Sequence, residues 1–253
     1  AALPLAERAV KAALKDAGLR PEHVDLLMTT TITGLSVPSL DARLMNRMEF
    51  RSDTKRVPLF GLGCLAGAAG LARASEYLRA YPDQVAVLLS VELCSLTVQT
   101  DDVSVANLIS TGLFGDGAAA VVLVGAEHPL ARKARPEVVD SRAQFFPHTE
   151  RVMGWDVVDS GFRIVLDSDV PKLAEAHVPV LVDALLAQRE LTREHVKAWV
   201  AHPGGPAVIA AMTRGLGLDE AALDPTRRTL REVGNLSSAS VLFLLDEHRR
   251  AQK

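Results

Sequence analysis

Cys64 stands at a junction between two kinds of sequence where a thiol can act as a nucleophile. The apolar segment Val57–Gly63 precedes it and predicts a strand, and the small-residue segment Leu65–Leu71 follows it and predicts a helix. A thiol at a helix start lies near unpaired backbone N–H groups and the positive end of the helix dipole, which favour the thiolate. Cys64 is therefore a candidate for covalent catalysis, which requires a base nearby.

His202 is the candidate base. It follows the expected strand Ala198–Ala201, and ligands collect at the strand ends of open parallel sheets. The next turn contains Gly204 and Gly205, which leave room for the backbone of a ligand. A lone histidine can also be a hydrogen-bonded structural residue, and the turn is what favours a role in a site.

An internal repeat relates Asn235 to Cys64. Leu19–Asp25 and Leu191–Lys197 have similar sequences, and each is expected between a helix and a strand. Nearly the same offset places Asn235 opposite Cys64, at the start of an equivalent helix. If the two halves pack about a pseudo-twofold axis, these helix starts approach each other at the centre. Asn235 considered alone could equally be an N-cap.

Composition excludes several classes of protein. The 253 residues are 48% hydrophobic with a formal net charge of −3, which is typical of one large globular domain or two fused halves. Charges of both signs are interspersed, so no nucleic-acid or membrane surface is expected. We expect a cytoplasmic protein, because we recognise neither a membrane-spanning run nor a secretory signal. The two cysteines, Cys64 and Cys94, predict neither a metal site nor a disulfide framework.

The elements that must position these side chains alternate between strands and helices. Apolar periodicity predicts a first helix over Leu3–Ala17, which Gly18 ends. Further strands are expected over Val24–Thr31, Val57–Gly61, Val85–Val91 and Phe114–Val124, and further helices over Ser39–Met48, over Ala66–Ala80 and from about Pro171. Residues 125–165 predict a connection with a hairpin or irregular loops. Continuous apolar strands separated by helices indicate a parallel sheet that is covered on both faces.

A dinucleotide-binding site is the main competing interpretation of the Cys64 turn. Gly61, Gly63 and Ala66 match a glycine pattern between a strand and a helix, and Glu92 ends the next strand where a ribose-binding acid is expected. Such a fold has no role for a bulky cysteine inside this pattern. It also has no role for the correspondence between Cys64 and Asn235 in the repeat. Cys64 could also be a buried structural cysteine.

Four ordered segments resemble the signature segments of type III polyketide synthases, the chalcone synthase superfamily. They are Val57–Gly67, Leu113–Ala119, Trp199–Pro206 and Gly234–Phe243. The resemblance spans almost the whole chain and implies a homodimer with a thiolase-like α/β fold, in which αβαβα layers are built from two pseudo-twofold-related βαβαβ halves. It implies three parts: an N-terminal half over residues 1–125, a connecting and cavity-lining segment over 126–170, and a C-terminal half over 171–253.

The resemblance implies a catalytic triad of Cys64, His202 and Asn235. A thiolate–imidazolium pair would let Cys64 attack the thioester of an acyl-CoA starter. After malonyl-CoA loses carbon dioxide, His202 and Asn235 would donate hydrogen bonds to the enolate oxygen, and the carbanion would attack the acyl group on Cys64. Repeated condensation and cyclisation would give a pyrone, a resorcinol or a related phenolic. The resemblance implies no metal or redox cofactor.

The resemblance also implies which residues contact the substrates. Phe114 would stand between the CoA tunnel and the cavity, and Val37 would cross into the pocket of a partner subunit. Ile32 differs from the residues of both chalcone-forming and tetrahydroxynaphthalene-forming members, so the product type stays open. Met153–Trp155 and Phe162–Val165 would cover the region of a second gate, and Phe162 and Ile164 are the alternatives for the gate residue. The remaining expected contacts are Thr31, Thr33, Cys94, Thr97, Gly204, Gly205 and Ala207.

Two other functions remain as alternatives. A β-ketoacyl-ACP synthase III of fatty-acid synthesis shares the Cys/His/Asn chemistry. The residues of the motifs His202–Pro206 and Gly234–Ser238 favour a polyketide synthase instead. A non-catalytic homologue that only binds acyl-CoA would not need the triad. Compared with the family, we also expect a partial chain that lacks the N-terminal CoA contacts and a glycine-rich C-terminal segment. Such a chain would be poorly active or unstable alone.

Overall fold

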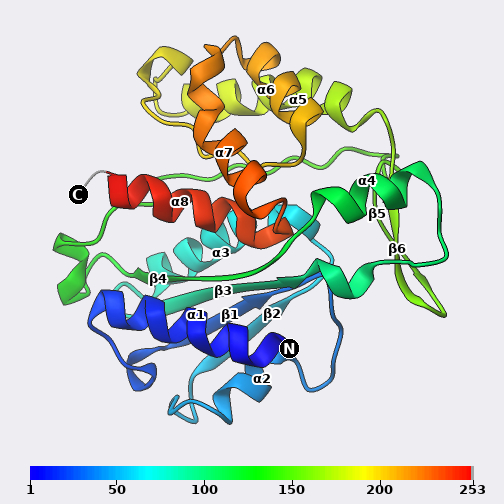
Figure 1. The fold of residues 1–253 in the computed structure, drawn as a ribbon. Coiled ribbons are helices and arrows are strands. Elements are labelled where there is room, and N and C mark those ends of the chain that lie inside the picture. The colour runs from blue at the N-terminus through cyan, green and yellow to red at the C-terminus, as the bar shows by residue number, and fades with distance from the viewer. Residues whose placement is uncertain (252–253) are drawn as a thin grey trace. The chain divides into compact units, whose positions relative to one another are not determined.

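The computed structural model describes residues 1–251, which form two compact units (Figure 1). Unit 1 comprises Ala1–Leu93, Asp116–Val139 and the described residues from Leu236 onward, whereas unit 2 comprises Cys94–Gly115 and Asp140–Asn235. These units are the compact parts of the chain and do not correspond to the two halves of the internal repeat. The division of the chain at residues 125 and 170 therefore stays a prediction.

Unit 1 is built on a four-stranded sheet. β1 (Leu26–Thr30) pairs in parallel with β2 (Lys55–Leu59) and β3 (Val85–Leu93), whereas β4 (Asp116–Val124) pairs antiparallel to β3. The strand order is β2-β1-β3-β4. The expectation of a wholly parallel sheet is therefore wrong at β4. The last residue of β3 pairs with the first of β4, because residues 94–115 return the chain to the same end of the sheet and a parallel connection would have to cross it.

β2 is an edge strand and the least buried strand of this sheet. It ends at Leu59 and not at Gly61, and most of its residues are exposed. Pro58 lies within it, and proline, which has no backbone N–H, is confined in sheets to edges, strand starts and bulges. The expectation of a strand covered on both faces is therefore wrong for β2.

Helices cover both faces of the central strands. α1 (Ala2–Ala17) and α2 (Leu40–Met45) pack on one face, and α3 (Ala66–Ala80) and α8 (Ser240–Ala251) pack on the other. Successive residues of each central strand alternate between the two cores: Leu27 and Val87 face α1, whereas Met28 and Leu88 face α3. A strand that is buried on both sides favours apolar residues on both of its faces, which explains the continuous apolar runs Leu26–Met28 and Val85–Leu89.

Unit 2 consists of helices and one hairpin. Its helices are α4 (Val105–Leu113), α5 (Val170–Ala187), α6 (Pro206–Leu216) and α7 (Asp224–Val233), and β5 (Met153–Val158) and β6 (Gly161–Leu166) form the hairpin. The hairpin confirms the expectation for the connecting region. The strand expected at Ala198–Ala201 is not formed, since residues 196–205 lie outside any helix or strand. An apolar pattern marks a segment that can become a strand, but a strand also needs a pairing partner, and none of the described strands pairs with this segment.

Short 3-10 turns connect these elements. They are η1 (Pro21–His23), η2 (Gly63–Leu65), η3 (Cys94–Thr97), η4 (Pro129–Arg132), η5 (Arg193–His195), η6 (Glu220–Leu223) and η7 (Ser237–Ala239). In η1 and η5 the ring Nδ1 of His23 or His195 accepts a hydrogen bond from the backbone N–H of Arg20 or Thr192. This shared capping box confirms the internal repeat at these segments.

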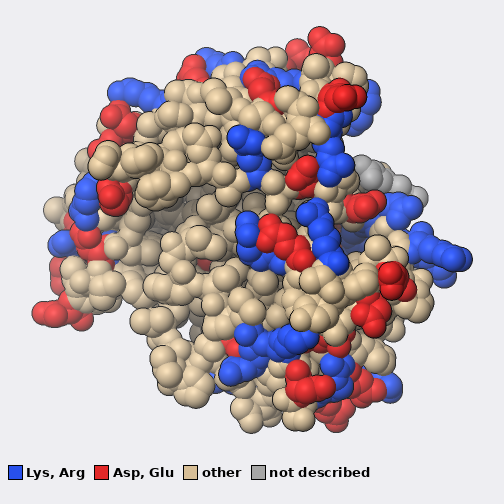
Figure 2. All heavy atoms as spheres, turned by 180° about the vertical axis from the view of Figure 1, so that it is seen from behind, with Lys and Arg blue, Asp and Glu red and all other residues tan. Residues whose placement is uncertain are grey.

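Charged side chains of both signs are intermixed on the face shown in Figure 2, as the interspersed charges of the sequence predict. Among residues 1–251, no helix combines the length and the apolar character that a membrane span requires.

Candidate active site

Cys64 occupies the middle of η2, immediately before α3 begins at Ala66. Its surroundings raise the pKa of the thiol to about 11. Burial is the largest cause and the Glu92 carboxylate adds to it, whereas a hydrogen bond with Ser237 acts in the opposite direction. The net effect of these surroundings is therefore the opposite of the thiolate expected at a helix start, because loss of water around the sulfur favours the neutral thiol. Cys64 needs a cation in order to ionise near neutral pH.

The two repeat-related helix starts are in contact within unit 1. η2 and α3 pack against η7, and α3 also packs against α8. A Cβ atom at Gly67 of α3 would lie 2.2 Å from the carbonyl oxygen of Ser238 in η7, so glycine is required for this approach. The contact confirms the meeting of helix starts that the repeat predicts.

Glu92 anchors the segment that carries Ile32 and Thr33. Its fully buried carboxylate accepts hydrogen bonds from the Ile32 backbone N–H at 3.0 Å and the Thr33 hydroxyl at 2.9 Å, and another from the Ser238 hydroxyl. Burial raises the pKa of Glu92, and these donors oppose the rise. A carboxylate enclosed in this way is not open to a ribose, which contradicts the dinucleotide interpretation. The sequence carried a signal for this role, since Glu92 is the one charged residue of β3.

Asn235 is fully buried beside Phe114 in unit 2. Its backbone N–H donates to the Leu113 carbonyl at 2.8 Å, and the Gly115 N–H donates to the Asn235 carbonyl at 3.0 Å. Gly234 permits this approach, because it has a φ of 75° and a Cβ atom there would lie 2.9 Å from the Leu113 carbonyl oxygen. Asn235 is not the N-cap of the next turn, η7, whose N-cap is the following residue. The N-cap interpretation is therefore wrong.

His202 lies in the irregular segment before α6. Both of its ring nitrogens are buried and have no hydrogen-bond partner among residues 1–251. Burial lowers the pKa of His202 to about 4, so its surroundings favour the neutral imidazole. The His202 carbonyl accepts a hydrogen bond from the Gly204 N–H at 2.9 Å. Gly205 is the N-cap of α6, and Ala207 lies in its first turn.

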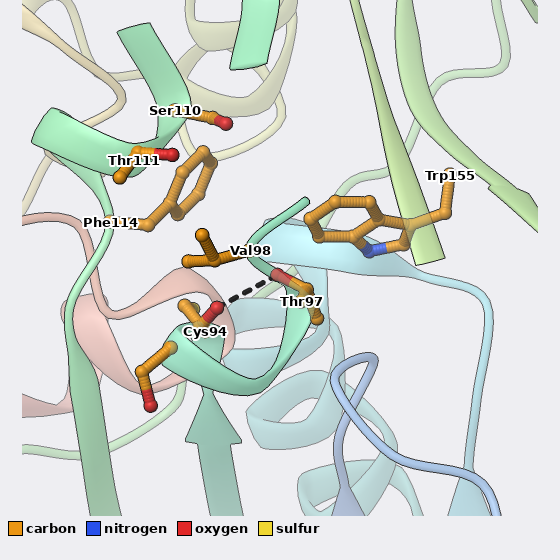
Figure 3. Close-up of a pocket in the computed structure, with 8 residues that line it drawn as sticks. Cys94, Thr97, Val98, Ser110, Thr111, Phe114 and Trp155 are labelled. Carbon is orange, nitrogen blue, oxygen red and sulfur yellow. Dashed lines mark hydrogen bonds between the residues drawn. The ribbon is translucent and has the colours of Figure 1, made fainter. Parts of the chain in front are cut away.

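A cavity of about 110 Å³ lies in unit 2, with walls from η3, α4 and β5 (Figure 3). Three residues that the family resemblance places against the substrates, Cys94, Thr97 and Phe114, line it. Trp155 lies on the side away from Phe114, and Val98 lies between them. Ligand pockets usually measure about 300–1,000 Å³, so this space is small for a ligand pocket. The other lining residues are Ser95, Ser110 and Thr111.

Trp155 lines the cavity and lies in one of the two segments expected to cover the region of the second gate, although it was not one of the two alternatives for the gate residue. The available signal was a bulky aromatic residue after Gly154, in a chain with two tryptophans. Phe162 and Ile164, the alternatives for a second gate, do not line this cavity. The Phe162 and Trp155 ring centroids lie 6.3 Å apart, and Ile164 is opposite Trp155 in the hairpin ladder. The identity of the second gate stays a prediction.

The sequence-predicted site residues divide between the two units. Unit 1 carries Cys64, Thr31, Ile32, Thr33 and Val37, and unit 2 carries His202, Asn235, Phe114, Cys94, Thr97, Gly204, Gly205 and Ala207. The structure brings Phe114 beside Asn235 and places Phe114, Cys94 and Thr97 around one cavity. The assembly of all three triad residues stays a prediction.

Comparison with known families gives two matches along the chain. Residues 4–141 match the family described as FAE1/Type III polyketide synthase-like protein. Residues 137–253 match the C-terminal domain of chalcone and stilbene synthases.

Individual relatives agree with these matches. The 1,3,6,8-tetrahydroxynaphthalene synthase of Streptomyces peucetius subsp. caesius is 50% identical over 97% of this chain and 65% of that protein. A putative chalcone synthase of Bacillus subtilis is 42% identical over 90% of this chain and 63% of that protein. The chain therefore spans just under two thirds of the length of these curated relatives.

Solved structures show the same relationship. The 1,3,6,8-tetrahydroxynaphthalene synthase of Streptomyces coelicolor superposes with a TM-score of 0.87 at 34% identity, over 94% of this chain and 67% of that one. PKS-I of the brown alga Ectocarpus siliculosus gives a TM-score of 0.92 at 30% identity, over 99% of this chain and 66% of that one.

Proposed function

Because the chain belongs to the type III polyketide synthases, within the chalcone and stilbene synthase family, and has their thiolase-like fold, we propose that it condenses malonyl-CoA iteratively onto an acyl-CoA starter. The starter is held on Cys64, and the poly-β-keto chain closes to a pyrone, a resorcinol or a related phenolic. The 110 Å³ cavity beside Phe114 supports a short starter. The reaction is an acyl transfer.

The observation that carries this proposal is the environment of His202. Its two ring nitrogens are buried and lack hydrogen-bond partners among the described residues, whereas His23 and His195 use a ring nitrogen to cap a turn. A buried polar atom without a partner costs about 1–3 kcal/mol. A purely structural histidine would gain nothing in return for this cost. A catalytic histidine regains it when its ring nitrogen contacts a thiolate or a substrate oxygen.

In the loading step that we propose, His202 takes the thiol proton of Cys64. The thiolate attacks the thioester carbonyl of the starter, a carbon–sulfur bond to Cys64 forms, and the bond to the CoA sulfur breaks. The CoA thiolate leaves with the proton from the imidazolium. His202 returns to the neutral form that its surroundings favour.

In the extension step, the bond between the malonyl carboxylate and its α-carbon breaks and carbon dioxide leaves. The electron pair forms an enolate, whose oxygen accepts hydrogen bonds from the His202 ring N–H and the Asn235 amide. The α-carbon then attacks the acyl carbonyl on Cys64, and the Cys64 thiolate leaves. Each step transfers an acyl group or releases carbon dioxide without net oxidation, so we propose no metal or redox cofactor.

Mass spectrometry of the intact protein tests the covalent step. Incubation with acyl-CoA starters from acetyl-CoA to octanoyl-CoA should add one acyl group to the wild-type protein, and later addition of malonyl-CoA should release a cyclised product. Cys64→Ala should form no adduct and should lose product by on the order of 10³-fold or more, because the nucleophile is absent.

Cys94→Ala serves as the matched control, because it removes the other cysteine and leaves Cys64 in place. It should retain the adduct. An adduct that persists in Cys64→Ala, or its absence from the wild-type protein with every starter, would contradict the proposal. Extension from malonyl carried on an acyl carrier protein, but not from malonyl-CoA, would indicate a β-ketoacyl-ACP synthase III instead.

A further inference from the structure

Gln99 joins two walls of the cavity in unit 2. Its Nε2 donates to the Phe162 carbonyl at 3.1 Å, and its Oε1 accepts a hydrogen bond from the Ser160 hydroxyl at 2.5 Å. Ser160 lies in the turn of the β5–β6 hairpin and Phe162 lies at the start of β6. Gln99 follows Val98, which lines the cavity. The glutamine therefore ties the hairpin to the segment that forms another wall.

Asn107 fixes the backbone of Gln99 from α4. Its buried side-chain amide donates to the Gln99 carbonyl at 2.8 Å and to the Asp102 carbonyl at 2.6 Å. Its backbone N–H donates at 3.3 Å to the hydroxyl of Ser104, the N-cap of α4. These bonds hold the loop at residues 99–104 against α4, the helix that ends beside Phe114.

The hairpin residue held by Gln99 is the one that packs on Trp155. The Phe162 ring contacts the Trp155 ring at a centroid distance of 6.3 Å. Trp155 faces Val98 and Thr97 across the cavity (Figure 3). The wall position of Trp155 thus depends on Phe162, and the position of Phe162 depends on Gln99.

We propose that Gln99, fixed by Asn107, is a positioning residue that holds the Trp155 wall of the cavity and thereby restricts the enzyme to short acyl-CoA starters. The inference rests on the proposed function. It adds a specificity determinant that lies outside the cavity and touches no substrate.

Quenching of tryptophan fluorescence measures how accessible Trp155 is to a solute, and it requires no enzyme turnover. In a Trp199→Phe background, emission comes from Trp155 alone, because the chain has two tryptophans. Gln99→Met keeps the length of the side chain and removes its hydrogen bonds to Ser160 and Phe162. We expect acrylamide to quench the fluorescence of Trp155 about fivefold more effectively in Gln99→Met. A factor of this size corresponds to the net stabilisation by about one hydrogen bond.

Starter preference measures the consequence for specificity. The ratio of kcat/KM for octanoyl-CoA to that for acetyl-CoA should rise by about fivefold in Gln99→Met, chiefly through a lower KM for the longer starter. Ser160→Ala removes only the bond from the Ser160 hydroxyl to Gln99 Oε1, so it should change the quenching and the ratio in the same direction by a smaller factor.

Gln144→Met is the matched control, because Gln144 is an exposed glutamine of unit 2 outside the cavity. It should change neither quantity. Unchanged quenching in Gln99→Met, or increased quenching with an unchanged starter ratio, would overturn the inference. A wild-type protein that forms no acyl adduct with any starter would contradict the proposed function, and the quenching would still report on the link between Gln99 and Trp155.

Discussion

At the scale of single residues, the surroundings of Cys64 and His202 hold each side chain in its neutral form. Burial raises the pKa of Cys64 to about 11 and lowers the pKa of His202 to about 4. Each ion alone is therefore disfavoured near neutral pH. A thiolate–imidazolium pair can form there only if the two side chains stabilise each other, because opposite charges in contact favour both charged forms. Reactivity near pH 7 is thus a direct measure of the pair.

Alkylation with iodoacetamide tests the pair. In a Cys94→Ser background only Cys64 can react, and with His202 present we expect labelling near pH 7. In His202→Ala the thiolate loses its counter-ion and forms only as the pH approaches about 11, so the labelling rate should keep rising through the alkaline range. Identical pH profiles for the two proteins would contradict the ion pair.

At the scale of elements, the contact between α3 and η7 places the nucleophile turn against the second repeat. The contact depends on Gly67, where a Cβ atom would lie 2.2 Å from the Ser238 carbonyl oxygen. The nearest atom is backbone, so no rotation of a side chain can relieve this contact, and the Cβ atom would also lie 2.7 Å from Val241 Cγ2. Gly67→Ala should therefore lower the free energy of unfolding by about 3 kcal/mol, as overpacking does in well-packed cores. Urea denaturation monitored by circular dichroism measures the change.

Gly112→Ala provides the control for this prediction. Gly112 also lies in a helix, α4, but a Cβ atom there would meet nothing within 4 Å. Alanine has the higher helix propensity, so this substitution should be neutral or should stabilise the protein by up to about 1 kcal/mol. Equal destabilisation by both substitutions would show that the contact with Ser238 is not the cause.

The spacing of apolar residues predicted those helices and strands whose buried face is determined by their own residues. α1, α3 and β3 lie close to their expected positions because the side chains that face the core repeat along the segment itself. The direction of β4 depends on how residues 94–115 return to the sheet, and strand formation at Ala198–Ala201 depends on a neighbouring strand. The spacing of apolar residues within a segment determines neither the direction of a strand nor whether a pairing partner is present.

The candidate site also contains features that the sequence predicts and features that depend on the folded chain. Cys64, His202 and Asn235 could be selected from residue type, turn chemistry and the repeat. The pKa of Cys64 could not be predicted, because it depends on burial and on Glu92, which is brought near by folding of the sheet. Gln99 lies outside the cavity and meets the hairpin only in the folded chain, so nothing in its immediate neighbours in the sequence indicated it.

At the scale of the whole molecule, unit 1 exposes an apolar surface beside the Cys64 turn. Phe60, Leu62 and Leu65 are 52%, 41% and 57% exposed. They adjoin β2, an edge strand that pairs on one side with β1. Unpaired edges and contiguous apolar surface are typical of association sites. We propose that a second copy of the chain covers this surface, as the family resemblance implies, and that the 92%-exposed Val37 reaches into the partner's pocket.

The mass of the protein in solution tests this homodimer. Phe60→Lys replaces an exposed ring beside β2 with a charge that a copy packed on this surface would have to desolvate, at a cost of several kcal/mol if the charge has no partner. Sedimentation equilibrium should therefore give a dimer for the wild-type protein and a monomer for Phe60→Lys at the same concentration. Phe145→Lys makes the same change at an 82%-exposed phenylalanine of unit 2 and should remain a dimer. A wild-type monomer, or a Phe60→Lys protein that stays dimeric, would place any interface elsewhere on the molecule.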